Sequence, residues 1–143
     1  MLYIHHKKGY TEIVFKTHEL IVDKSNISVI KKICKNNLFN YDYRIKYTKE
    51  ILNIKTKPPL YINENILLIP TKSLRSYDNV WINYFNVGRV VKKGSKCKVI
   101  FVDLKEIILD ISYQSFLKSV NDAKKIINYV NLIIEDYKFM KIA

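Results

Sequence analysis

A short cationic loop is the part of this sequence whose residue types could do chemistry. Two apolar runs typical of strands lie between Ile66 and Val87 and flank a polar connection. The connection presents Thr71, Lys72, Ser73, Arg75, Ser76 and Tyr77. Pro70 ends the first run because its ring fixes φ and removes the amide donor, and Asp78-Asn79 supplies turn chemistry before the second run. Hydroxyl and cationic side chains held between two strands predict contact with a polyanion.

A second group of lysines surrounds Lys93-Gly94-Ser95-Lys96, which has the residues of a hairpin turn. Lys and Arg side chains that neutralise phosphates make binding to nucleic acid weaken steeply with salt. We expect phosphate contacts from Lys55, Lys57, Lys72, Ser73, Arg75, Lys92, Lys93, Lys96 and Lys98. The alternative is that these charges form an ordinary solvated surface.

The composition fits a basic globular protein with one domain over residues 1–143. Twenty-five Lys and Arg against 13 Asp and Glu give a net charge of +12 and a pI near 9.6, while 48% of residues are hydrophobic. This balance predicts a nucleic-acid partner or, less specifically, an anionic membrane surface. Codon supply in an AT-rich genome would also enrich Lys, Asn, Ile and Tyr, so part of the charge must be discounted.

Nothing in the sequence indicates an enzyme, a cofactor or a metal site. His5, His6 and His18 have no acidic or cysteine partner at ligand spacing, and there is no glycine loop that could cradle phosphates. Cys34 and Cys97 form neither a metal pair nor a disulfide framework, which favours a reducing cytoplasm. No targeting segment and no apolar run of membrane-spanning length is visible, so we expect no catalytic residues and a cytoplasmic location.

The first half of the chain must supply strands and helices that carry the loop. We predict two short strands in Thr11–Val22 around a turn near Thr17-His18, then a helix over Ile27–Lys35 that Ser25 or Asn26 caps and Asn36-Asn37 ends. Tyr41–Ile54 permits a helix or a strand, and we predict a helix. Lys57-Pro58-Pro59 predicts an extended connection. Further strands are expected at Leu60–Asn63, Ile66–Ile69 and Val80–Val87.

The second half predicts a run of antiparallel strands followed by a long helix. The strands are expected at Arg89–Lys92, Cys97–Val102 and Glu106–Ile111. Ser112 or Ser115 can cap the helix, whose wide apolar stripe can serve as core, as a dimer seam or as both. Together these elements predict an α+β fold, mainly an antiparallel sheet with an N-terminal helix and a long C-terminal helix packed on or beside it.

Four fragments, taken in order, resemble the competence transcription factor family, ComK. They are K-P-P-L at Lys57–Leu60, I-L-L-I-P-T-K-S at Ile66–Ser73, V-W-I-N at Val80–Asn83 and I-S-Y-Q-S-F at Ile111–Phe116. The resemblance covers residues 57–116, and the earlier part of the chain aligns only by general pattern.

The resemblance implies a bacterial activator that binds paired AT-rich promoter boxes as a dimer or higher homo-oligomer, with minor-groove contacts, and switches on genes for DNA uptake. Such a protein would be cytoplasmic and nucleoid-associated when bound to double-stranded DNA. The family is also controlled by a protease adaptor that recognises the C-terminal region. This chain is shorter at that end, where Phe139-Met140-Lys141-Ile142 is weakly similar to the adaptor-binding segment. The alternative is a shortened regulator or protein-interaction module that modulates another activator without binding DNA, and a third hypothesis is a general RNA- or single-strand-binding protein.

Two residues of the central segment have competing interpretations. Arg75 could enter a narrow minor groove, because an Arg on a loop suits that site, or it could pair with Asp78 on the surface. Trp81 could stack on a base, but its place in an alternating strand favours the core. Tyr113 and Phe116 are expected to anchor the final helix on the sheet.

Overall fold

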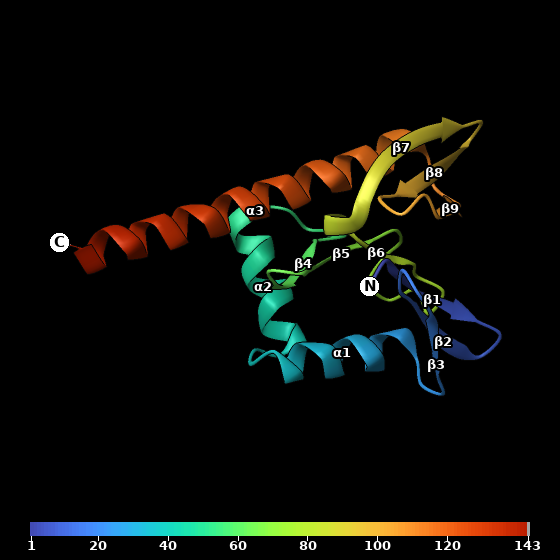
Figure 1. Cartoon of the computed structure of the whole chain (residues 1–143), viewed down its shortest axis with the longest axis horizontal. Coiled ribbons are helices and arrows are strands. Elements are labelled where there is room, and N and C mark those ends of the chain that lie inside the picture. The colour runs from blue at the N-terminus through green and yellow to red at the C-terminus, as the bar shows by residue number, and fades with distance from the viewer. Residues whose placement is uncertain (143) are drawn as a thin grey trace.

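A six-stranded antiparallel sheet forms the centre of the protein (Figure 1). The computed structural model describes the backbone of residues 1–142 and the side chains of residues 1–136. The strands are β1 (Tyr3–Lys7), β2 (Tyr10–Val14), β3 (Glu19–Val22), β4 (Leu60–Asn63), β5 (Ile66–Pro70) and β6 (Trp81–Asn83). Their order in the sheet is β3-β2-β1-β6-β5-β4. Strand β6 therefore joins the N-terminal hairpin to the β4–β5 hairpin, although these are far apart in the sequence.

A smaller antiparallel sheet and three helices complete the described part of the chain. The sheet contains β7 (Val87–Lys93), β8 (Lys96–Phe101) and β9 (Glu106–Leu109), and the helices are α1 (Asn26–Asn36), α2 (Tyr41–Leu52) and α3 (Tyr113–Ile142). Figure 1 shows α3 running beside the small sheet and continuing well past α2. The predicted α+β class, with antiparallel sheets and a long C-terminal helix, is confirmed.

The two faces of the large sheet carry two separate hydrophobic clusters. Trp81 is 1% exposed and packs in the cluster on the side of α1 and α2, whereas its neighbour Ile82 packs in the cluster under α3 and the small sheet. This alternation follows from the two-residue repeat of a strand. The prediction of a core Trp81 is therefore confirmed. Phe116, fully buried at the start of α3, anchors that helix on the second cluster as expected, and Tyr113 packs beside it.

Polar side chains begin the helices where the sequence predicted. The amide of Ser28 donates to Ser25 Oγ at 3.2 Å, and the amide of Ser115 donates to Ser112 Oγ at 3.1 Å. These caps satisfy amides that have no partner within the helix. The predicted helix at Tyr41–Ile54 is confirmed as α2. At the end of α1, Asn37 is the capping residue as predicted, but the left-handed conformation falls on Leu38, with φ of 81°.

Three local predictions were wrong or incomplete. Strand β1 was not predicted, although Lys8-Gly9, with φ of 47° and 87°, forms the tight turn that joins it to β2. The expected strand Val80–Val87 is only three residues of β6, followed by a 3₁₀ turn over Tyr84–Asn86 that leads the chain into the second sheet. Lys57 is not extended, because its φ is 47°.

Candidate nucleic-acid interface

The loop between β5 and β6 is built around the side chain of Asn79, which is 1% exposed. Its Oδ1 accepts hydrogen bonds from the amides of Thr71 and Lys72, both at 3.0 Å. Its Nδ2 donates to the carbonyls of Lys72 and Ser73, both at 3.1 Å. One amide group thus fixes the backbone from which the cationic side chains project. The sequence predicts only a turn role for Asn79.

A second polar contact ties this loop to the rest of the fold. Asn26, at the start of α1, donates from Nδ2 to the Asn79 carbonyl at 2.7 Å, and Thr11 of β2 donates to Asn26 Oδ1 at 2.7 Å. Because both contacts are buried, they are worth more than exposed ones and leave the loop little freedom. Thr71, which we expected to be presented on the loop, is instead buried and binds the amide of Val80.

A basic pocket opens beside the loop, with a volume of about 650 Å³. We use this name for the hollow lined by Lys49, Lys55, Thr56, Lys57, Lys72, Ser73, Leu74 and Arg75. Its cations come from the end of α2, from the segment before β4 and from the loop after β5. The structure therefore brings together five predicted phosphate contacts, namely Lys55, Lys57, Lys72, Ser73 and Arg75. Lys49 was not predicted; it lies on α2, outside the basic runs of the sequence.

The electrostatics of the pocket are almost entirely positive. No acidic side chain is part of the described lining, although Asp78 lies at its margin. Lys72 Nζ donates to Asp78 Oδ2 at 2.7 Å, and this bond raises the pKa of Lys72 and lowers that of Asp78. The alternative interpretation of Arg75, a surface pair with Asp78, does not describe this arrangement, because Lys72 takes the carboxylate. Arg75 stays exposed at the pocket.

Lys57 reaches the pocket from a constrained backbone. Its left-handed φ is uncommon for a residue with a side chain, and it precedes Pro58, which restricts it further. Its Nζ lies 3.0 Å from Ser115 Oγ at the start of α3. The pocket is therefore connected to the long helix as well as to the large sheet.

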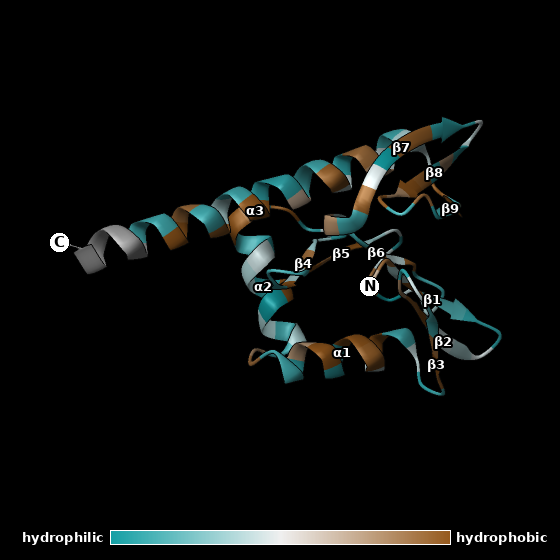
Figure 2. Ribbon diagram, in the orientation of Figure 1, coloured by the Kyte–Doolittle hydropathy of each residue, from teal (hydrophilic) through white to brown (hydrophobic). Residues whose placement is uncertain are grey.

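The hairpin lysines lie elsewhere. Lys93 and Lys96 face each other across the turn between β7 and β8, with Lys92 one residue before them, and all three are exposed. None of them lines the basic pocket. Figure 2 shows the hydrophilic tip of this hairpin pointing away from the large sheet. Lys98, further along β8, lies 3.3 Å from Glu106 and is partly neutralised.

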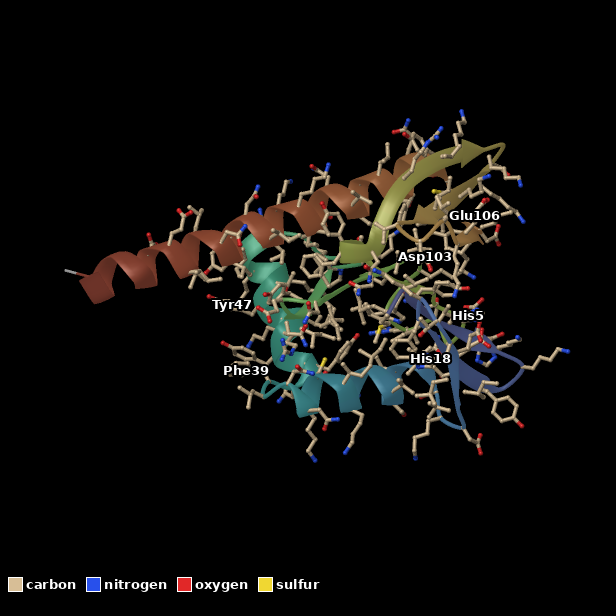
Figure 3. The ribbon with its side chains drawn as sticks, viewed as in Figure 1. His5, His18, Phe39, Tyr47, Asp103 and Glu106 are labelled. Atoms are coloured by element: carbon tan, nitrogen blue, oxygen red, sulfur yellow. The ribbon has the colours of Figure 1, made fainter. Side chains whose placement is uncertain are left out.

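A different surface lies between α2 and α3. We call it the aromatic groove; its volume is about 640 Å³ and its aromatic lining residues are Phe39, Tyr43, Tyr47, Tyr61 and Tyr129. The rings of Phe39 and Tyr43, and those of Tyr43 and Tyr47, stack with centroids 5.8 Å apart. Figure 3 shows Tyr47 on α2 and Phe39 in the loop before α2, both beneath the projecting end of α3. Phe39, Tyr43 and Tyr47 follow one another at four-residue spacing, which places the two tyrosines on the same face of α2.

Arg44 holds the walls of the aromatic groove together, because its guanidinium is occupied by hydrogen bonds to backbone carbonyls. Its guanidinium donates to the carbonyls of Phe39, Asn37, Tyr61 and Ile62 at 2.7–3.1 Å. It thus joins α2, the preceding loop and β4. The hydroxyls of Tyr47 and Tyr129 share a hydrogen bond of 2.9 Å that joins α2 to α3 and raises the pKa of Tyr47.

Other chemistry finds little support in the described residues. His5 Nε2 lies 2.7 Å from Glu12 Oε1 and His18 stacks on Phe15, but no cluster of three metal-binding side chains occurs in this part of the chain. Within the described residues, none of the helices has the length and apolarity to cross a membrane. The side chains of Phe139-Met140-Lys141-Ile142, which is weakly similar to the family's adaptor-binding segment, lie outside the described residues.

Comparison with known proteins gives one result. Residues 2–133 match the family described as ComK protein, which is most of the 143-residue chain. Neither the curated proteins nor the solved structures gave a match.

Proposed function

This chain belongs to the ComK family, which consists of competence transcription factors and not of enzymes, and from that premise we propose that it activates DNA-uptake genes by binding AT-rich promoter DNA. The family match extends the resemblance of residues 57–116 to residues 2–133. We propose further that the protein acts in the cytoplasm, on the nucleoid, as a homo-oligomer. We also propose that a protease adaptor controls the level of this protein.

The basic pocket is the observation that carries the DNA-binding part of this proposal. Lys49, Lys55, Lys57, Lys72 and Arg75 line one hollow, and buried hydrogen bonds hold in place the loop that supplies Lys72 and Arg75. A loop whose backbone is fixed in this way can contact a phosphate backbone with little loss of loop freedom. Arg75 is the cation we assign to the minor groove, whose narrow AT-rich form attracts an inserted Arg. We place the hairpin cations Lys92, Lys93 and Lys96 at the edge of the contact.

Salt-titrated binding to two duplexes tests the proposal. Fluorescence anisotropy would compare an AT-rich and a GC-rich duplex of equal length, with a single strand of the AT-rich sequence as a third ligand. We expect the AT-rich duplex to bind most tightly and log affinity to fall with log salt by about 0.9 for each contacted phosphate. Absence of duplex binding at low salt would contradict the proposal, and preference for the single strand would favour a general single-strand-binding protein.

A protein-interaction module is the second candidate, and the aromatic groove favours it. Phe39, Tyr43 and Tyr47 are large exposed side chains that a partner protein could cover. Under this function the chain would modulate another activator without binding DNA itself. This second function predicts that the protein folds fully, that it has no affinity for any duplex, and that its partner protein binds at the aromatic groove.

A further inference from the structure

The outer part of α3 exposes apolar side chains that its own fold leaves uncovered. Leu132, Ile133 and Ile134 are 59%, 48% and 46% exposed, and the described residues 131–136 are all exposed. Figure 1 shows this part of α3 extending beyond α2, away from both sheets. Neighbouring large apolar side chains that are this exposed are what a partner would cover.

One wall of the aromatic groove is formed by the turns of α3 just before this segment, together with Ile133 inside it. Ile126, Tyr129, Val130 and Ile133 of α3 line it, opposite Tyr47 of α2. Their spacings of three and four residues place them on one face of the helix. A second helix laid along this face would cover Ile133 and also fill the groove.

The charges beside this face indicate which helix fits. Lys125 and Asp136 are both exposed and lie about three helical turns apart, so they occupy the same flank of α3, about 16 Å from each other. An antiparallel copy of α3, related by a twofold axis near Val130 and Asn131, would place Lys125 of each helix beside Asp136 of the other. A parallel copy, related by a twofold axis along the helices, would put Lys125 of the two helices on opposite flanks of the seam, and likewise Asp136, so no opposite charges would meet. The charge pattern therefore complements itself in the antiparallel arrangement only.

The same register pairs the apolar side chains. With the axis near Asn131, Tyr129 of one helix lies beside Ile133 of the other, and the relation is reciprocal, as a twofold interface requires. We propose that two copies of this chain associate through the antiparallel pairing of their α3 helices over residues 126–136, each closing the aromatic groove of its partner. This inference rests on the homo-oligomer part of the proposed function and assigns its surface; it does not depend on DNA binding.

Sedimentation equilibrium without DNA tests the pairing. We expect the protein to be dimeric and Ile133→Asp to be monomeric at the same concentration. Lys125→Glu and Asp136→Lys should each weaken dimerisation about tenfold, because each places two like-charged pairs at the seam. The double variant Lys125→Glu/Asp136→Lys should restore the wild-type dimer, because it exchanges the charges within each pair.

Matched controls separate this surface from general effects of charge. Lys118→Glu makes the same charge change on the inner half of α3 and should leave dimerisation unchanged, and circular dichroism should show equal helix content in all variants. A wild-type protein that stays monomeric, or a double variant as weak as either single one, would overturn the proposal. The sedimentation experiment contains no DNA, so a protein that fails to bind duplex could still show the α3 pairing. A protein that is monomeric but binds duplex would refute the α3 pairing and leave the DNA-binding proposal standing.

Discussion

The basic pocket and the tip of the β7–β8 hairpin are both rich in cations but differ in how these are held. The pocket collects side chains from three segments, and the buried Asn79 fixes the loop on one side of it. The hairpin tip places Lys92, Lys93 and Lys96 on one two-stranded turn, where all are exposed and face solvent. Side chains free to move lose entropy when they bind, whereas a fixed loop has already lost much of it.

We therefore expect local charge density in the sequence to be a poor guide to the strength of a DNA contact. The hairpin has the denser run of lysines, yet the pocket gains Lys49 and Lys57 from segments that are distant in the chain. Convergence of this kind depends on the topology, which no local pattern contains. It follows that the pocket should dominate DNA binding and the hairpin should contribute less.

The largest effect is expected from removing the group that orders the pocket. Asn79→Ala leaves the amide of Lys72 and two carbonyls without their partner, which should lower the free energy of unfolding by about 3 kcal/mol. Urea unfolding measures this loss. Ser95→Ala at the exposed hairpin turn is the matched control and should change stability little. Equal stabilities for the two variants would show that Asn79 does not hold the loop.

Replacing Arg75 should show that the basic pocket, unlike the hairpin tip, contributes to the preference for AT-rich DNA. We expect Arg75→Ala to weaken binding to an AT-rich duplex about tenfold and to a mixed-sequence duplex much less, because the minor-groove contact is lost only on the first. Lys93→Ala, which also removes one charge, should weaken both duplexes slightly and equally. Anisotropy titrations at one salt concentration provide the comparison. Equal losses from Arg75→Ala on both duplexes would make Arg75 a phosphate contact.

Asp78 should lower the affinity of the pocket for duplex DNA by neutralising Lys72, so removing its charge should strengthen DNA binding. Asp78→Asn frees Lys72 from its 2.7 Å ion pair and removes a negative charge near the DNA. We expect affinity for duplex to rise about threefold at low salt, since exposed ion pairs are weak. Glu106→Gln, which releases Lys98 near the hairpin, is the corresponding change in the other region and should have a smaller effect. A fall in affinity for Asp78→Asn would show that the ion pair is needed to position Lys72.

The smallest expected effect is the pH dependence of the ion pair between Lys72 and Asp78. The hydrogen bond from Lys72 lowers the pKa of Asp78, so its stabilising contribution is present above the ordinary value near 3.8 and disappears as the pH falls through the lowered value. Carboxyl NMR titration should show Asp78 titrating below that value, and Lys72→Gln should move it upward. An unchanged midpoint in Lys72→Gln would show that the ion pair does not form in solution.

The sequence predicted most clearly those features that depend on neighbouring residues. Ser25 and Ser112 were identified as candidate caps because a cap acts within one helical turn, and Trp81 was assigned to the core from strand alternation. Strand β1 was missed because its polar pattern, with His5 and His6 in the middle, hides a strand that is stabilised by pairing with β2 and β6.

The pocket was predicted only as a set of separate basic segments. Lys55, Lys57, Lys72 and Arg75 were named, but their shared hollow depends on how β4 and β5 pair and on where α2 ends. The scaffolding role of Asn79 also depends on contacts with Asn26, more than fifty positions earlier in the chain. Long-range hydrogen bonds of this kind leave no periodic signal in the sequence.

The salt dependence of two triple variants tests the central claim most directly. One variant carries Gln at Lys49, Lys55 and Lys57 in the pocket, and the other carries Gln at Lys92, Lys93 and Lys96 in the hairpin, so both lose three lysine charges. With an AT-rich duplex, the pocket variant should reduce the slope of log affinity against log salt by about 2.7 and the hairpin variant by about 1 or less. An equal or larger reduction in the hairpin variant would contradict the claim that the basic pocket is the main DNA contact.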